Sequence, residues 1–128
     1  MILVDTSIWI DHLRSGNAAL ARLLGRGAVL GHPWVIGELA LGRLSKRQEV
    51  LRLLRNLPTA NVATPDELLL FIERRQLAGH GIGYVDAQLL AAARMTPYAQ
   101  LWTSDKHLST AAARLGLAVD RETLSREH

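Results

Sequence analysis

Four acidic side chains stand in segments that are otherwise apolar. Asp5 and Asp105 follow runs typical of buried strands, whereas Glu38 and Asp86 interrupt apolar helical runs. Two carboxylates ~4 Å apart repel each other by about 4 kcal/mol at an effective dielectric near 20. If the four side chains converge, they must therefore take up protons or bind a multivalent cation.

The available ligand types restrict the cation. The chain contains no cysteine, which excludes thiolate zinc sites and iron-sulfur clusters, and its scattered histidines form no His-x-x-x-His pair. Oxygen ligands select hard ions, so we expect Mg²⁺ or Mn²⁺. Such an ion can activate water and stabilise charge on a phosphoryl group, which predicts hydrolysis of a phosphodiester.

Each acid taken alone also has a structural interpretation. Asp5, Asp86 and Asp105 could cap helices or interact with a helix dipole, and Glu38 could be a surface acid. This interpretation does not explain why all four acids lie in apolar segments that would meet at one edge of the fold. The metal-site interpretation explains that placement.

Short apolar strands alternate with helices along the chain. Strands are expected at residues 1–4, 28–30, 60–63, 100–103 and 117–119. Helices are expected at residues 8–13, 17–24, 34–44, 45–57 with Ser45 as the cap, 65–77, 84–95 and 105–115, followed by a polar tail. The alternation predicts an α/β sandwich around a mainly parallel sheet, whose sites lie at the carboxyl ends of the strands.

Length and charge limit the class of protein. The chain has 128 residues, and no linker or repeat divides it, so residues 1–128 are expected to form a single domain. No apolar run approaches the ~18 to 20 residues of a membrane span, and the first residues do not resemble a signal peptide, so a cytoplasmic protein without membrane contact is expected. The net charge of +3 favours a polyanionic partner.

The acid-bearing segments resemble the successive signatures of PIN-domain ribonucleases, and the size and spacing are most similar to the VapC-like toxins of toxin-antitoxin modules. The segments are residues 2–10 (Ile-Leu-Val-Asp-Thr-Ser-Ile-Trp-Ile), Glu38 in its helix, residues 83–91 (Gly-Tyr-Val-Asp-Ala-Gln-Leu-Leu-Ala) and residues 103–108 (Thr-Ser-Asp-Lys-His-Leu). The resemblance implies a three-layer α/β/α sandwich and a Mg²⁺- or Mn²⁺-dependent endoribonuclease. It implies that four acids are metal ligands and catalytic residues: Asp5, Glu38, Asp86 and Asp105.

The resemblance also implies a supporting role for hydroxyl groups. Thr6 or Ser7, together with Thr103, would orient an acid, the metal or a water. The sequence leaves open which hydroxyl does so, because Thr6, Ser7, Thr103 and Ser104 all lie within two residues of an acid.

The same resemblance implies a small VapB-like antitoxin and a homodimer. A cluster of carboxylates is a natural target for an arginine of such a partner, because a guanidinium forks onto carboxylate oxygens and competes with metal. An apolar surface patch formed by residues such as Trp9, Leu13 or Leu41 would be the dimer interface.

Further candidates carry weaker signals. A basic group could follow an RNA backbone or could simply be a solvated helix face; it comprises Arg43, Lys46, Arg47, Arg52 and Arg55. Core or subunit contacts are favoured over base stacking for the three tryptophans, Trp9, Trp34 and Trp102. Surface or packing roles are favoured for the histidines His12, His32, His80 and His107.

Two alternative functions remain open, a housekeeping RNA-processing nuclease and a non-catalytic RNA-binding module. A phosphotransfer domain of the haloacid dehalogenase type is disfavoured, because Ser7 stands where its pattern requires a second acid. A structure-specific DNA nuclease is disfavoured because the chain has no room for flap-threading elements.

Overall fold

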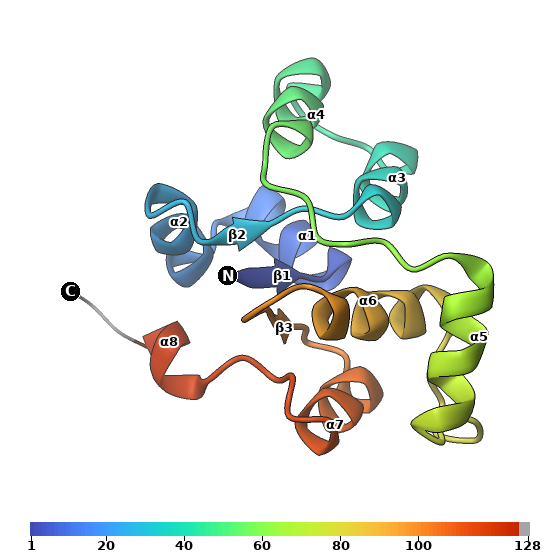
Figure 1. The fold of residues 1–128 in the computed structure, drawn as a ribbon. Helices are drawn as coiled ribbons and strands as arrows, with labels where there is room; N and C mark the ends of the chain where they lie inside the picture. The colour runs from blue at the N-terminus through green and yellow to red at the C-terminus, as the bar shows by residue number, and fades with distance from the viewer. Residues whose placement is uncertain (126–128) are drawn as a thin grey trace.

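A computed structural model describes residues 1–125 as a parallel three-stranded sheet flanked by helices (Figure 1). The strand order is β2-β1-β3, with β1 (Ile2–Val4) in the centre, β2 (Val29–Leu30) on one side and β3 (Gln100–Trp102) on the other. The helices are α1 (Thr6–Ser15), α2 (Ala18–Gly25), α3 (Pro33–Leu41), α4 (Arg47–Arg55), α5 (Pro65–Arg74), α6 (Tyr84–Met95), α7 (Lys106–Arg114) and α8 (Arg121–Ser125).

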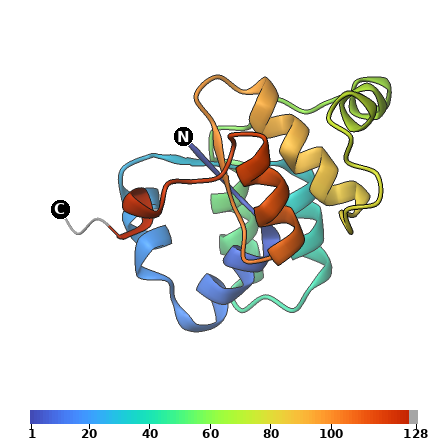
Figure 2. The ribbon, with the colours of Figure 1, turned by 90° about the horizontal axis from the view of Figure 1, so that it is seen from below.

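Helices cover both faces of the sheet, as the predicted α/β/α sandwich requires. Helices α3 and α4 lie above the strands in Figure 1, and α7 and α8 lie below them. Figure 2 looks from below and shows α6 and α7 on that side, and α5 packs against the outside of α6. The fold class expected from the sequence is confirmed.

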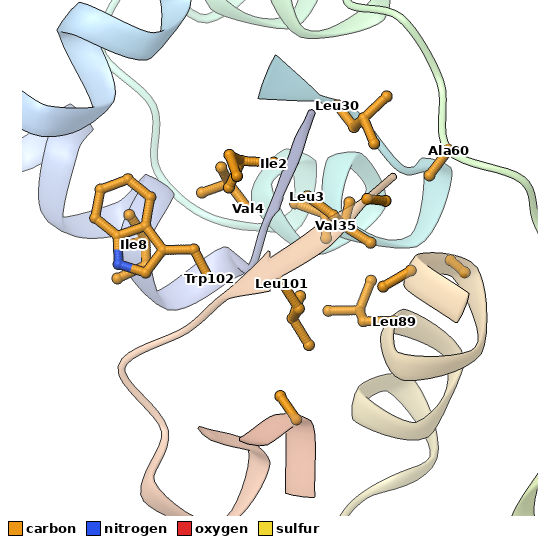
Figure 3. Packing of buried hydrophobic residues seen from close by; sticks show 14 of the residues in the cluster. Ile2, Leu3, Val4, Ile8, Leu30, Val35, Ala60, Leu89, Leu101 and Trp102 are labelled. Carbon is orange, nitrogen blue, oxygen red and sulfur yellow. The ribbon is translucent and has the colours of Figure 1, made fainter. Parts of the chain in front are cut away.

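The central strand is buried on both faces, which explains its continuous apolar sequence. Leu3 and Val4 are fully buried and pack with Leu101 and Trp102 of β3 (Figure 3). Leu3 pairs with Leu101, and Val4 pairs with Trp102, in parallel register. The residues that directly follow β1 and β3 are therefore brought out at the same sheet edge.

The expected strand at residues 117–119 is reduced to a single bridge, in which Ala118 pairs in parallel with Leu101. A second bridge pairs Thr59, which lies just before the other expected strand, with Gly31. The expected strand at residues 60–63 does not form, because the backbone and side-chain amides of Asn61 donate to Thr96 Oγ1 and the Met95 carbonyl, respectively, and not to a neighbouring strand.

The start of α4 differs from the expected one. Ser45 does not cap this helix; the N-cap is Lys46, whose backbone is left-handed with φ 52° and whose side chain makes no capping hydrogen bond. The guanidinium of Arg47 donates instead to the carbonyls of Ala40 and Gly42, at 2.5 and 3.3 Å. These bonds hold the end of α3 against the start of α4.

The polar tail contains a helix that the sequence did not predict. The guanidinium of Arg22 in α2 donates to the carbonyls of Thr123 and Leu124 in α8, at 3.4 and 2.8 Å. A contact between segments about a hundred residues apart leaves no local sequence pattern, so α8 could not be predicted from the sequence of the tail. In the part of the chain described here, no helix is both long and apolar enough to span a membrane.

Candidate active site

Two of the acids lie at the carboxyl edge of the sheet, as predicted. Asp5 directly follows β1 and is the N-cap of α1, and Asp105 follows β3 and is the N-cap of α7. The Asp105 carboxylate accepts a hydrogen bond of 2.8 Å from the backbone N–H of Leu108. The capping role considered for these residues is thus real, and it fixes both carboxylates at the sheet edge.

Asp5 is the most firmly held of the four acids. Its side chain is only 6% exposed. Oδ1 accepts from the backbone N–H of Thr6 at 2.7 Å, and Oδ2 accepts from the hydroxyls of Ser7 at 3.0 Å and Thr103 at 2.7 Å. A carboxylate offers about four acceptor positions, so only one remains free for a further ligand.

Glu38 approaches the same edge from another helix. It is exposed on α3, and its Oε1 accepts a hydrogen bond of 2.6 Å from the Thr6 hydroxyl. This bond ties Glu38 to the residue next to Asp5. Glu38 is a surface acid, as the structural interpretation proposed, but its carboxylate is bonded to the residue that directly follows Asp5.

Asp86 is the acid whose pKa is raised by its surroundings. It lies half-buried in the first turn of α6. Burial, foremost, and the negative charges of Asp5, Asp105 and Glu38 together raise the pKa of Asp86 from 3.8 to about 6, while a hydrogen bond with the Gly83 backbone opposes the shift. The four acids therefore act on one another, and no cationic side chain in the described residues contributes to the pKa of Asp86.

The acids do not form a closed coordination sphere in this arrangement. Among residues 1–125, no group of three or more Asp, Glu, His or Cys side chains has the spacing of a formed metal site. Coordination of Mg²⁺ needs oxygens at 2.0–2.1 Å, whereas Coulomb repulsion of the kind felt by Asp86 acts over a longer range. The donor set, which consists entirely of carboxylate oxygens with uncompensated charge, fits a hard divalent cation.

The hydroxyl groups near the acids donate hydrogen bonds to two of them. The Thr6 hydroxyl donates to Glu38, whereas the hydroxyls of Ser7 and Thr103 both donate to Asp5. Thr103 Oγ1 also accepts from the backbone N–H of Asp105 at 3.0 Å, and Ser104 contributes only its backbone N–H, to Ser7 Oγ. The sequence placed Ser7 among the candidates by its proximity to Asp5, but its bond to the same oxygen as Thr103 depends on the pairing of β1 with β3.

A groove of about 750 Å³ reaches one of the four acids, Glu38. Helices α1, α3 and α4 form it, and Glu38 lies in its lining. Its apolar walls include Ile10, Leu13, Leu39 and Leu53, and its charged lining consists of Glu38, Glu49, Arg14, Arg43 and Lys46. The groove depends on three helices meeting, and no local sequence pattern predicts it.

Three of the remaining candidates have structural roles. Trp9 and Trp102 are buried in the core, so Trp9 cannot form the surface patch that was expected of it. His32 is completely buried and caps α3, its Nδ1 accepting from the Trp34 N–H at 3.0 Å, and this burial lowers the pKa of His32 to about 4. Trp34 is the exception, because it is exposed.

Comparison with known proteins shows the family of the chain. Residues 2–114 match the family model described as PIN domain. The chain is also 50% identical over 122 residues to proteins named Ribonuclease VapC32 from Mycobacterium tuberculosis strains CDC 1551 / Oshkosh and H37Rv, covering 95% of this chain and 98% of each relative. The chain belongs to the PIN-domain family, as a VapC-like member.

Proposed function

We propose that this protein is a divalent-metal-dependent endoribonuclease that acts as the toxin of a toxin-antitoxin module. The observation that carries the proposal is the placement of the acids: Asp5 and Asp105 cap helices at the same edge of the sheet, and the Thr6 hydroxyl next to Asp5 donates to Glu38. Burial and the neighbouring acids raise the pKa of Asp86, which agrees with this placement. The name of the M. tuberculosis relatives, Ribonuclease VapC32, supports RNA as the substrate. We also propose that residues 1–128 form one domain and that the protein acts in the cytoplasm.

In this proposal Asp5, Glu38, Asp86 and Asp105 hold Mg²⁺ or Mn²⁺. When bound, the ion supplies an activated water and stabilises negative charge on the phosphate. Asp5 is the fixed ligand, because three hydrogen bonds orient it before any cation arrives. Asp86 is the ligand that must lose a proton, so metal binding is expected to weaken as the pH falls below about 6.

The other side chains keep these carboxylates in place. Thr103 and Ser7 hold Oδ2 of Asp5, and Thr6 holds Oε1 of Glu38. Three of the acids also lie at helix N-termini, where the partial positive charge of the helix offsets part of their repulsion. Thr6 and Thr103 are therefore proposed as positioning residues and not as proton donors.

The test is cleavage of defined and total RNA with Mg²⁺ or Mn²⁺. The variants Asp5→Asn, Glu38→Gln, Asp86→Asn and Asp105→Asn should each reduce cleavage by about 100-fold or more, since charge stabilisation by a metal is worth several kcal/mol. Asp66→Asn and Glu73→Gln remove the same charges from exposed positions on α5 and should cleave at the wild-type rate.

Metal removal supplies the second arm of this test. A chelator should stop cleavage by the wild type, and excess Mg²⁺ or Mn²⁺ should restore it. Wild-type rates in all four site variants would refute the acid site. RNA binding without any cleavage, retained in Asp5→Asn, would leave the non-catalytic binding module as the function.

We further propose that a small VapB-like antitoxin inhibits the site with an arginine. The groove supports this partner, because its apolar walls lead to Glu38 and would guide a bound segment toward the acids. Expression of the chain alone should arrest growth, co-expression of the neighbouring small gene should relieve the arrest, and Asp5→Asn should be harmless. Unimpaired growth with the active chain would favour a housekeeping RNA-processing nuclease.

We also propose that the protein forms a homodimer. Leu41 is 91% exposed and Leu13 is 38% exposed, so both remain available for the interface, in contrast to Trp9. Light scattering should give twice the monomer mass, and Leu41→Glu should lower it. A monomer at all concentrations would refute this part of the proposal and leave the nuclease assignment unaffected.

A further inference from the structure

Two exposed aromatic side chains contact each other beside the acids. The rings of Trp34 and Tyr84 have centroids 5.7 Å apart and an interplanar angle of 50°. Trp34 is 37% exposed and Tyr84 is 48% exposed, whereas Trp9 and Trp102 are 4% and 8% exposed. This pair is therefore a surface feature and not an extension of the core.

The pair bridges the two helices that carry Glu38 and Asp86. Trp34 lies in the first turn of α3, four residues before Glu38, and side chains at this spacing share a helix face. Tyr84 is the first residue of α6, two residues before Asp86. With a rise of ~1.5 Å per residue, both aromatic residues lie within about 6 Å of these acids along the helix axes.

The backbone beneath Trp34 is fixed. The Trp34 N–H donates to Nδ1 of the buried His32, at 3.0 Å, and this bond holds the start of α3. Tyr84 follows Gly83, the N-cap of α6. The Trp34 ring is thus presented from an anchored helix start, which lowers the conformational entropy that a ligand would have to remove.

We propose that Trp34 and Tyr84 form a stacking platform for an unpaired base of single-stranded RNA adjacent to the phosphate that is cleaved. This inference rests on the proposed nuclease function and names two residues that would bind the substrate, because an unpaired base exposes its face to aromatic rings. The platform would hold bases with little regard to identity, since every base has a π-face. Structured, fully paired RNA would be a poor substrate.

Binding of a short single-stranded oligoribonucleotide tests the platform. Measurements in an Asp5→Asn background prevent cleavage during the titration. Trp34→Ala and Tyr84→Ala should each raise the Kd by about 5- to 150-fold, the range found for loss of one base-aromatic stack, and Trp34→Phe should retain most of the affinity. Tyr98→Ala removes a tyrosine that is 95% exposed elsewhere and should leave the Kd unchanged.

Tryptophan fluorescence gives a readout that a merely structural role would not move. Because Trp34 is the one exposed tryptophan of the three, the oligonucleotide should quench the emission of the wild type, and Trp34→Phe should bind without quenching. An oligonucleotide with an abasic residue at the stacked position should bind the wild type more weakly than the intact oligonucleotide does. The Trp34→Ala variant should bind the two oligonucleotides with the same Kd.

The outcomes separate this inference from the nuclease assignment. RNA cleavage by the wild type together with unchanged Kd and KM in both alanine variants would overturn the platform alone. Loss of antitoxin binding with unchanged RNA affinity would also overturn it and would assign the pair to the protein partner. Absence of both RNA binding and cleavage in the wild type would overturn the platform and the nuclease together.

Discussion

Asp5 and Asp86 belong to the same acid cluster but occupy opposite kinds of environment. Asp5 is almost completely buried at the end of β1 and accepts three hydrogen bonds. Asp86 is half-buried on α6, and the pKa of its carboxyl is raised to about 6 by burial and by the neighbouring acids. One acid is held in position by three hydrogen bonds, whereas the ionised form of the other is disfavoured by its surroundings.

This difference indicates a division of labour within one site. A carboxylate held by hydroxyls and an amide keeps its position with or without a ligand, so it can set the geometry. A carboxylate whose charge is opposed responds strongly to a bound cation, so it can couple metal binding to pH. Replacing each acid should therefore have opposite effects on the metal-free protein.

The largest effect is expected at Asp5. Asp5→Ala leaves two hydroxyls and one amide without their acceptor in a buried position, and it should lower the free energy of unfolding by about 3 kcal/mol or more. Asp86→Ala should leave the metal-free stability unchanged or raise it. Urea denaturation of both variants measures the contrast, and an equal loss in the two would break the comparison.

The next largest effect is expected at Thr103. Thr103→Val keeps the side-chain volume but removes the donor to Asp5 Oδ2, which should cost about 1.5 to 3 kcal/mol of stability and also reduce RNA cleavage. Thr103→Ser keeps the hydroxyl and should recover most of both properties. Equal behaviour of valine and serine at this position would show that the hydroxyl does not hold Asp5.

The pH dependence of Asp86 should be visible in thermal unfolding. Because the folded-state pKa of about 6 lies above the ordinary value of 3.8, the ionised carboxyl weakens the fold, and this loss develops as the pH rises from about 4 through 6. Asp86→Asn should match the wild type near pH 4 and exceed its Tm by a few °C above pH 7. A Tm difference that does not vary with pH would contradict the raised pKa of Asp86.

The smallest effect is expected at Asp105, where capping and charge can be separated. Asp105→Asn retains a good N-cap for α7 and should change the free energy of unfolding by only a few tenths of a kcal/mol, whereas Asp105→Ala should cost about 1 kcal/mol. Both variants should lose RNA cleavage. Activity in the asparagine variant would reduce Asp105 to a cap.

The sequence predicted the parts of the fold that depend on local pattern. The three strands, seven of the helices and the position of Asp5 and Asp105 at the sheet edge follow from apolar runs, capping residues and strand ends. The bond between Thr103 and Asp5 spans 98 residues and could only be a candidate before the strands were paired. Helix α8 and the Trp34–Tyr84 contact depend in the same way on distant segments meeting.

A carboxyl NMR titration of Asp86, with and without Mg²⁺, tests the central claim most directly. The account predicts a pKa of about 6 for Asp86 in the metal-free protein and a much lower pKa in saturating Mg²⁺, because the cation stabilises the ionised form. The pKa in the metal-free Asp5→Asn variant should lie between these values, since one repelling charge is gone. A pKa near 3.8 in the metal-free protein, unchanged by Mg²⁺, would contradict the four-acid metal site.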